Sequence, residues 1–166
     1  MHFKVRPLVD SDTEWTRRFI INQWGDESVV VHGSSYLSHE LSGFVAITGR
    51  SKRVGIVTYV IQDSACEIVT INSLIEGEGI GTALVKAIQD ISIRNACSRL
   101  WCITTNDNLP ALRFFQKCGF RIVRVNPSAV ERARVIKPSI PLYGLESIPI
   151  RDQIELEIQT ISAANQ

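Results

Sequence analysis

The chain has 166 residues, 45% hydrophobic and 21% charged, so it is long enough for one domain with a sizeable core and too short for two ordinary ones. Its 18 basic and 17 acidic residues give a formal charge of +1, so we expect neither nucleic acid nor an anionic membrane as a partner. No stretch free of charged residues exceeds the twelve of Ser28–His39, and the first ten residues lack the pattern of a signal peptide, so we expect a cytoplasmic protein without a membrane span.

The first half of the chain predicts one edge strand, one helix and then three strands. Pro7 limits the first strand to a sheet edge because proline has no amide hydrogen to donate. Ser11 or Asp12 is expected to cap the helix, and Gly25 to end it. The predicted elements are a strand at Phe3–Val9, a helix at Ser11–Trp24, a hairpin at Ser42–Ile61 joined by GRSKR, and a strand at Cys66–Ile71.

The second half predicts a regular alternation of helices and strands. Apolar residues recur at helical spacing over Gly79–Arg94, and a second helix in Asn108–Gly119 has a capping asparagine, an early proline and a terminating glycine. The predicted strands are Leu100–Thr104, Phe120–Val125 and Ile150–Ile158. Residues 126–149 carry four of the six prolines and are expected to form a long loop inserted before the last strand.

Cysteines and histidines do not predict a metal site. The four cysteines form no C-x-x-C pair, and Cys66 and Cys102 lie in apolar runs where burial is expected. The histidines His2, His32 and His39 show no ligand spacing, and only His32 and His39 are kept as residues that could lie near a substrate.

The segment that carries chemistry is a strand, ACEIVTINSL, followed by the turn IEGEGIG and the helix TALVKAIQDI. Gly77, Gly79 and Gly81 remove side chains where backbone amides turn inward, and the start of a helix offers unpaired N–H groups with a partial positive charge. Together they predict an anion-binding cradle. The alternative is a glycine-rich turn that serves only to reverse the chain. A dinucleotide fingerprint and a P-loop both fit poorly, because Thr82 replaces the required glycine and no Gly-Lys-Ser/Thr follows.

This turn, followed by N-x-x-A-x-x-x-F-x-x-x-GF at Asn108–Phe120, closely resembles the GNAT superfamily of acetyl-CoA-dependent N-acyltransferases. The resemblance covers about residues 44–158, and the segments TTNDNLPALRFFQKCGF, IKPSIPLYG and IPIRDQIELEI are similar to a bacterial branch whose members are poorly characterised. It implies a single α/β (α+β) domain over residues 1–166. Its sheet would be mixed and mostly antiparallel, with about seven strands and about four flanking helices. Two parallel strands, Cys66–Ser73 and Leu100–Thr105, would splay apart to admit the pantetheine arm.

The resemblance also implies which residues hold the coenzyme, and no metal. The pyrophosphate would rest on the glycine turn, Asn108 would help to hold the coenzyme arm, and amides around Ile71 would meet the thioester carbonyl. The implied coenzyme-binding residues are Ile71, Gly77, Gly79, Ile80, Gly81, Thr82, Asn108 and Phe115.

Two positions depart from the family pattern. Glu76, with Glu78 nearby, stands where the family usually has glutamine or arginine, and a carboxylate there competes with a pyrophosphate. We expect weaker coenzyme binding. Phe115 stands where many members have a tyrosine that protonates the departing thiolate, and phenylalanine has no proton to give. Tyr143 could supply that hydroxyl, or could be an apolar anchor for its loop.

Glu67 is the candidate general base, since the attacking amine must lose a proton. If the strand alternates regularly, Glu67 shares a face with Ala65, Val69 and Ile71, an apolar setting that raises a carboxyl pKa. Some members of the family have an acid at the corresponding place that serves as the base. The alternative is a structural carboxylate paired with a basic residue on a neighbouring strand.

Substrate walls in this fold come from the early segment and from the loop before the last strand. Trp24, Tyr36, Arg132 and Arg134 are the candidate substrate-binding residues, with the alternatives of core packing for the aromatic pair and a solvated surface for the basic pair. The sequence thus predicts acetyl transfer from acetyl-CoA to a primary amine on a small molecule or peptide, by direct attack in a ternary complex. The alternatives are an acyl-CoA-binding module with weak or no catalysis, and a protein lysine or N-terminal acetyltransferase. A homodimer through exposed strand edges is compatible with the sequence.

Overall fold

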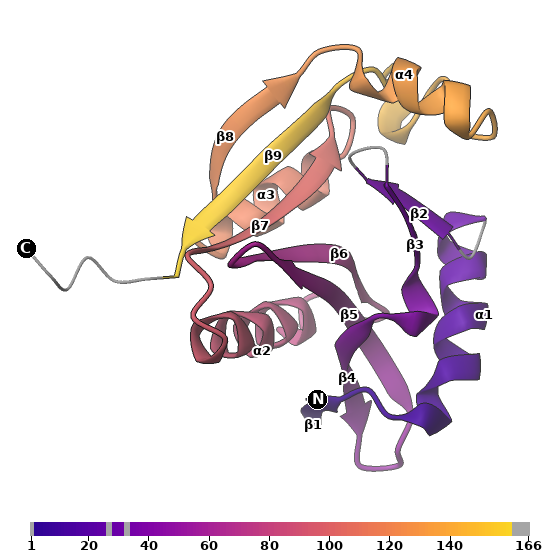
Figure 1. Ribbon diagram of the computed structural model, residues 1–166. Helices are drawn as coiled ribbons and strands as arrows, with labels where there is room; N and C mark the ends of the chain where they lie inside the picture. The colour runs from indigo at the N-terminus through magenta and orange to yellow at the C-terminus, as the bar shows by residue number, and fades with distance from the viewer. Residues whose placement is uncertain (1, 26–27, 32–33, 161–166) are drawn as a thin grey trace, which may run out of the picture. The chain divides into compact units, whose positions relative to one another are not determined.

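A computed structural model describes residues 2–25, 28–31 and 34–160 (Figure 1). They form two compact units, here called the N-terminal unit (residues up to Leu100, with Thr160) and the C-terminal unit (Trp101–Gln159). The described residues include four α-helices and the seven strands of the main sheet, and the strand pairs with a defined register are antiparallel. The predicted fold class, a mixed and mostly antiparallel α/β architecture, is confirmed.

The N-terminal unit contains a four-stranded antiparallel array in the order β1-β4-β5-β6. Pro7 is the last residue of β1, which lies at the edge of this array as its proline predicts. The elements of this unit are β1 (Phe3–Pro7), the 3-10 turn η1 (Asp10–Asp12), α1 (Thr13–Trp24), β2 (Ser28–Val31), β3 (Ser34–Leu37), the 3-10 turn η2 (Ser38–Glu40), β4 (Ser42–Thr48), β5 (Arg53–Gln62), β6 (Ala65–Ser73) and α2 (Ile80–Arg94).

The two long helices of this unit pack on opposite faces of the array. Ile56 of β5 is buried against Phe19 and Ile20 of α1, which defines the α1 face. On the other face, a Cβ added at Gly55 would lie 2.6 Å from Cγ2 of Ile80 and 3.2 Å from Cδ1 of Leu84, so glycine lets α2 approach the strand closely. Adjacent residues of β5 therefore face different helices.

The strand pairing between β5 and β6 contains a β-bulge. Thr58 pairs with Thr70, whereas Tyr59 pairs with Ile68, so Val69 has no partner of its own across the ladder. A bulge inserts one residue and reverses which side chains share a face on either side of it. The regular alternation expected for this strand is therefore broken between Glu67 and Ile71.

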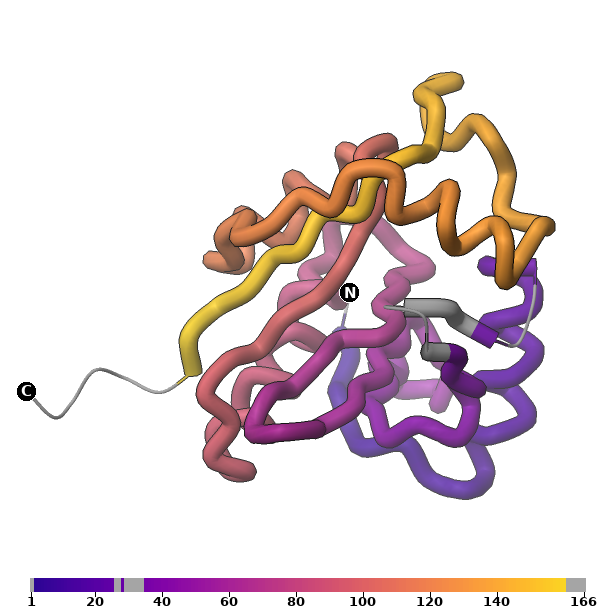
Figure 2. Tube along the Cα trace, turned by 45° about the horizontal axis from the view of Figure 1, so that its top comes forward, coloured from indigo at the N-terminus to yellow at the C-terminus, as the bar shows by residue number. Residues whose placement is uncertain are grey.

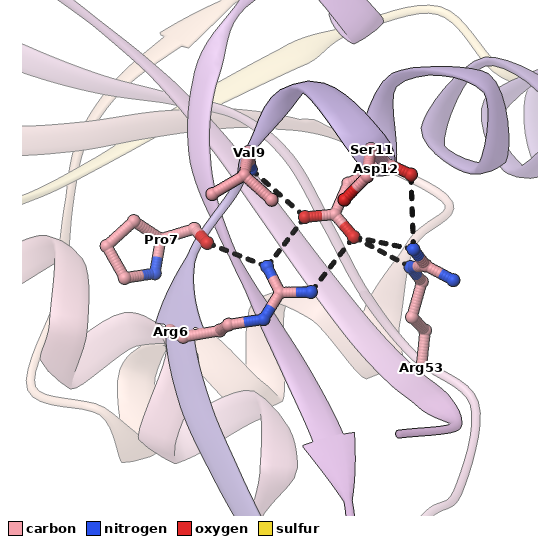
Figure 3. Close-up of polar contacts among 6 residues, drawn as sticks. All are labelled: Arg6, Pro7, Val9, Ser11, Asp12 and Arg53. Carbon is pink, nitrogen blue, oxygen red and sulfur yellow. Dashed lines mark hydrogen bonds and ion pairs between the residues drawn. The ribbon is translucent and has the colours of Figure 1, made fainter.

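Asp12 ties β1, β5 and the start of α1 together (Figure 3). Its carboxylate accepts hydrogen bonds from Arg6 at 2.6 and 3.0 Å, from Nε of Arg53 at 2.8 Å and from the amide of Val9 at 3.0 Å. Asp12 is the N-cap residue of α1, one of the two positions predicted, but its carboxylate makes no capping hydrogen bond to that helix and serves these other donors instead. Gly25 ends α1 in the left-handed region, as predicted.

The C-terminal unit carries the remaining strands in the order β7-β9-β8, and Figure 2 follows the chain from β8 through the next helix and back as β9. Its described elements are β7 (Arg99–Thr105), which begins in the N-terminal unit, α3 (Leu109–Lys117), β8 (Arg121–Asn126), α4 (Ala129–Ile136), the 3-10 turn η3 (Leu145–Ser147) and β9 (Gln153–Gln159). The ring of Phe115 packs edge to face against the rings of Phe114 and Phe120, with centroids 5.2 Å apart in each pair.

The structure differs from the sequence-based expectation in two segments. The long proline-rich loop is partly helical, because α4 occupies Ala129–Ile136 before the chain reaches Pro138. The hairpin of β2 and β3 was not predicted, although Val29–Val31 is a β-branched run. Among the described helices, none is long and apolar enough to cross a membrane.

Candidate active site

The turn between β6 and α2 has the geometry of a main-chain cradle. Gly77 and Gly79 adopt φ values of +76° and +77°, a region that side chains other than glycine rarely occupy. A Cβ added at either glycine would meet nothing within 4 Å, so the space in front of this backbone is open. A ligand that contacts main-chain atoms can therefore approach both residues without a side chain in the way.

The first amides of α2 are available to such a ligand. The first hydrogen bond of the helix runs from the amide of Ala83 to the carbonyl of Gly79, at 3.0 Å, so Ile80, Gly81 and Thr82 have no acceptor within the helix. Gly79 is the N-cap residue, and no side-chain oxygen among the described residues caps this end. With the partial positive charge of a helix of 15 residues, these amides fit an anionic diphosphate.

Two exposed carboxylates flank this turn. Glu76 and Glu78 precede the first turn of α2, and both side chains are exposed to solvent. A negative charge at this end of a helix interacts favourably with the helix dipole and therefore competes with an incoming phosphate. The geometry permits an anion, while the two charges lower the affinity expected for it.

Glu67 lies on the α1 face, and its neighbours differ from those predicted. Alternate residues of β5, namely Ile56, Thr58 and Val60, lie on one face of the array. Their respective partners on β6 are Asn72, Thr70 and Glu67, which therefore lie on the same face. Ile71 pairs with Val57 and lies on the other face, because the bulge at Val69 reverses the alternation. The prediction that Glu67 shares a face with Ile71 is therefore wrong.

The surroundings of Glu67 are polar as well as buried. Glu67 is only 7% exposed. On the same face, the buried hydroxyls of Thr58 and Thr70 lie 2.7 Å apart and form a hydrogen bond across the ladder. Glu67 is therefore a buried carboxylate on the face that also carries this hydroxyl pair, and a carboxylate is a group that can accept a proton from an amine.

Cys66, next to Glu67, does not provide a nucleophile. Its side chain is fully buried, and burial, followed by the neighbouring Cys97 and Glu67, raises the pKa of the Cys66 thiol to about 12. The thiol therefore stays protonated at neutral pH, whereas nucleophilic cysteines need the thiolate form. The burial predicted for Cys66 and Cys102 is confirmed.

Asn108 and Phe115, the two coenzyme-binding candidates of the C-terminal unit, both help to build α3. The side-chain oxygen of Asn108 accepts a hydrogen bond from the amide of Ala111 at 3.2 Å, which confirms Asn108 as the helix cap. Phe115 is buried in the aromatic cluster with Phe114 and Phe120. The coenzyme contacts implied for both residues remain predictions.

The candidate residues of the 126–149 segment have different environments. Arg134 donates through Nε to the carbonyl of Ile140 at 3.1 Å, and through Nη2 to those of Pro141 and Ile150 at 2.6 and 2.7 Å. These bonds fold the segment onto itself and favour a structural role for Arg134 over anion binding. Arg132 is exposed, and its Nη1 donates a hydrogen bond to the carbonyl of Pro127 at 3.1 Å.

Tyr143 is 64% exposed, and its only described pairing is an isolated bridge to Pro149. A ring with this exposure is not a buried anchor, so the apolar-anchor alternative is not supported. Its role as a proton donor remains a prediction.

Asn106 and Asp107, which sequence reasoning did not single out, hold this segment in place. Asn106 accepts from the amides of Arg151 and Asp152 at 2.9 and 3.0 Å, and donates to the carbonyl of Pro149 at 2.9 Å. Asp107 accepts from the amide of Leu145 at 3.1 Å. The only sequence signal was an Asn-Asp pair directly after a strand, a pattern that is common in turns.

The candidate substrate-binding residues of the N-terminal unit lie on α1 and β3. Trp24 is the last residue of α1 and is exposed, and Tyr36 is half-buried on β3. His32 lies outside the described residues.

A cavity of about 410 Å³ in the same unit was not predicted. It is lined by Leu8, Val9, Asp10, Asp12, Thr13, Thr16, His39, Glu40, Leu41 and Ser42. No group of three or more histidine, cysteine or acidic side chains gathers into a metal site within the part of the chain that the structure describes.

Comparisons with known proteins show the family of this chain. The family model described as Acetyltransferase (GNAT) family matches residues 9–120. YxbD of Bacillus subtilis, itself uncharacterised, is 40% identical over 138 residues, which cover 83% of this chain and 87% of YxbD.

Solved structures show the same fold at low sequence identity. A Bacillus subtilis acetyltransferase in complex with CoA has a TM-score of 0.65 at 16% identity, covering 95% of this chain and 97% of that one. The ribosomal-protein-S18-alanine N-acetyltransferase of Escherichia coli has a TM-score of 0.68 at 13% identity, covering 99% of both chains. From the family match over residues 9–120 and the relationship to YxbD, the chain belongs to the GNAT acetyltransferase family.

Proposed function

We propose that this protein transfers an acetyl group from acetyl-CoA to a primary amine by direct attack in a ternary complex. The observation that carries the proposal is the β6–α2 turn, where the uncapped amides of Ile80, Gly81 and Thr82 follow two glycines in the left-handed region. The CoA bound to the similar Bacillus subtilis acetyltransferase supports CoA as the cosubstrate. These main-chain groups would hold the diphosphate of the coenzyme.

In the proposed reaction, the amine nitrogen forms a bond to the acetyl carbonyl carbon while the carbon–sulfur bond breaks. Main-chain amides of β6 around Ile71 would stabilise the negative charge that develops on the carbonyl oxygen. Glu67 would accept the proton that the amine loses, directly or through one water. The products are an N-acetylated amine and the free thiol of CoA, so no covalent enzyme intermediate is needed.

The departing thiolate needs little help from a general acid. A thiol with a pKa of about 8.5 leaves readily as its anion near neutral pH, so the phenylalanine at position 115 does not exclude activity. The thiolate still takes up a proton to become the free thiol of CoA, and we assign this donation to Tyr143. On this basis, Tyr143→Phe should lower kcat. Phe115→Tyr should not restore the rate of that variant, because its added hydroxyl would lie in the buried aromatic cluster.

A second function, acyl-CoA binding without turnover, is favoured by Phe115 and by the carboxylates of Glu76 and Glu78. Release of free thiol from acetyl-CoA, measured across a panel of primary amines and lysine-containing peptides, separates the two. Amine-dependent thiol release supports the enzyme, and the type of amine that gives it separates small molecules from proteins as acceptors. Tight acetyl-CoA binding with no thiol release for any amine would contradict the enzymatic proposal.

A further inference from the structure

The cavity of the N-terminal unit lies between two short segments, and it is lined by none of the residues to which the proposed acetyl transfer assigns a role. One wall comes from Leu8–Thr16, the end of β1 and the start of α1, and the other from His39–Ser42, which precedes and opens β4. Its volume, about 410 Å³, is within the range of small-molecule sites. Most of its lining side chains are polar, so an apolar ligand is not expected.

Polar groups without partners gather at this cavity. Thr16 lines it, is only 1% exposed, and its hydroxyl has no hydrogen-bond partner among the described residues. Nδ1 of His39, which also lines the cavity, is buried and likewise has no partner in the described chain. The hydroxyl of Ser38, the neighbour of His39, does not line the cavity but is also buried without a partner among the described residues. Buried polar groups are nearly always paired, so this concentration favours a site for a polar ligand.

The charges around the cavity determine which ligand fits. Asp10 and Glu40 line it with exposed carboxylates, and no lysine or arginine lines it. Asp12 also lines it, but its carboxylate is already paired with Arg6 and Arg53 (Figure 3). The start of α1 would favour an anion, whereas Asp10 and Glu40 would repel one.

An ammonium group matches this set of partners. It carries three hydrogen-bond donors and no acceptor, whereas a hydroxyl oxygen and a carboxylate both accept. The hydroxyl of Thr16 and the carboxylates of Asp10 and Glu40 supply these acceptors. We propose that this cavity binds the ammonium group of a small organic cation. Identifying this cation with a second charged group of the acceptor amine rests on the proposed acetyl transfer. The binding site itself does not depend on that proposal.

Calorimetry with a matched set of probes tests the site on the whole chain without acetyl-CoA. The probes are 1,4-diaminobutane, butane-1,4-diol, which has the same length without charge, and succinate, which has the opposite charge. We expect heat of binding from the diamine alone. Equal binding of the diol, preferential binding of succinate or no binding of any probe would overturn the proposal.

Two substitutions locate the binding. Thr16→Val keeps the shape of the side chain and removes its hydroxyl, and Glu40→Gln removes a charge at the cavity. We expect each to weaken diamine binding about tenfold, since each removes a hydrogen bond or ion pair to a charged group. The control is Glu14→Gln, because Glu14 is an exposed residue of α1 that pairs with Arg18 and does not line the cavity. Unchanged affinity in both cavity variants would contradict the assignment.

Thermal unfolding distinguishes a ligand-binding hydroxyl from a structural one. Because the Thr16 hydroxyl has no partner among the described residues, Thr16→Val should unfold at the same temperature as the wild type or higher. A lower unfolding temperature would assign the hydroxyl a structural role and overturn its place in the site. The test is separate from that of acetyl transfer. If the wild-type protein binds acetyl-CoA but does not bind the diamine, only the cation site is refuted, and if it binds the diamine but not acetyl-CoA, only the proposed function is refuted.

Discussion

The hydroxyl groups of Thr58 and Thr70 lie 2.7 Å apart across β5 and β6, on the same face of the array as Glu67. This arrangement depends on the bulge at Val69, since a strand without it would place Thr70 and Glu67 on opposite faces. The bulge thus groups a buried carboxylate with a fixed pair of hydroxyls, and it leaves Ile71 on the face toward α2.

Glu67→Gln should lower kcat by about 10²-fold or more, because glutamine cannot accept the proton that the amine loses. The fall in rate at acidic pH, where protonation removes the base, should disappear in this variant, while acetyl-CoA affinity stays unchanged. The control is Glu155→Gln, which alters another buried strand carboxylate and should keep the pH profile of the wild type. If Glu67→Gln retains the kcat and pH profile of the wild type, Glu67 is not the base.

Glu76→Arg should strengthen acetyl-CoA binding by about two- to fivefold, because it replaces a charge that competes with the diphosphate by one that attracts it. Titration calorimetry measures the change at low salt. Glu131→Arg makes the same change of charge on α4 and should leave the affinity unaltered, which separates a local effect from one of net charge. Equal affinity of Glu76→Arg and wild type would contradict the location of the cradle.

Gly79→Ala should lower both stability and coenzyme affinity. An alanine held at a φ of +77° costs about 1 to 2 kcal/mol of unfolding free energy, and its methyl group projects into the open space in front of the amides. Gly25→Ala is the matched control, since Gly25 has a φ of +75° and equally open surroundings at the end of α1. We expect the same loss of stability there and normal acetyl-CoA binding. Parallel loss of binding in both variants would indicate general destabilisation instead.

Asp12→Asn should lower the unfolding free energy by about 3 kcal/mol, because it leaves the charges of Arg6 and Arg53 without their buried carboxylate. Hydrogen bonds from Arg6, and then from the Val9 amide and Arg53, hold the pKa of Asp12 well below its usual value, against the opposing effect of burial. A lowered carboxyl pKa stabilises the fold above the unfolded-state value of about 3.9 and ceases to do so as the pH falls through the folded value.

Chemical denaturation between pH 7 and pH 3 checks this prediction. The stability of the wild type should fall over that range more steeply than that of Asp12→Asn. Asp90→Asn is the control, because Asp90 forms an exposed pair with Lys86 at 3.4 Å that contributes at most about 1 kcal/mol. A variant at Asp12 with the stability of the wild type at pH 7 would show that this network contributes nothing.

Local signals in the sequence predicted the elements with strong patterns. The Asn108 cap, the early Pro110 and the left-handed Gly119 determine α3 through neighbours in the chain, and the glycine turn before α2 was located for the same reason. The hydrophobic spacing of α2 gave its limits to within one residue. These features depend on the backbone preferences of a few adjacent residues.

Features set by partners distant in the sequence could not be predicted. Asp12 has the residue type of a cap, yet Arg53, 41 residues away, and Arg6 engage its carboxylate instead. The bulge at Val69 follows from the register with β5 and reverses the face on which Glu67 lies. The sequence is compatible with an exposed Arg134, but the fold of its own segment places three carbonyl oxygens within hydrogen-bond distance of its guanidinium group.

The main-chain cradle can be tested most directly by amide chemical shifts of ¹⁵N-labelled protein during titration with CoA. The amide signals of Gly79, Ile80, Gly81 and Thr82 should shift most, and pantetheine, which lacks the diphosphate, should leave them in place. If millimolar CoA shifts none of these four amides, or if pantetheine shifts them equally, the diphosphate does not bind at the start of α2 and the proposed function loses its basis.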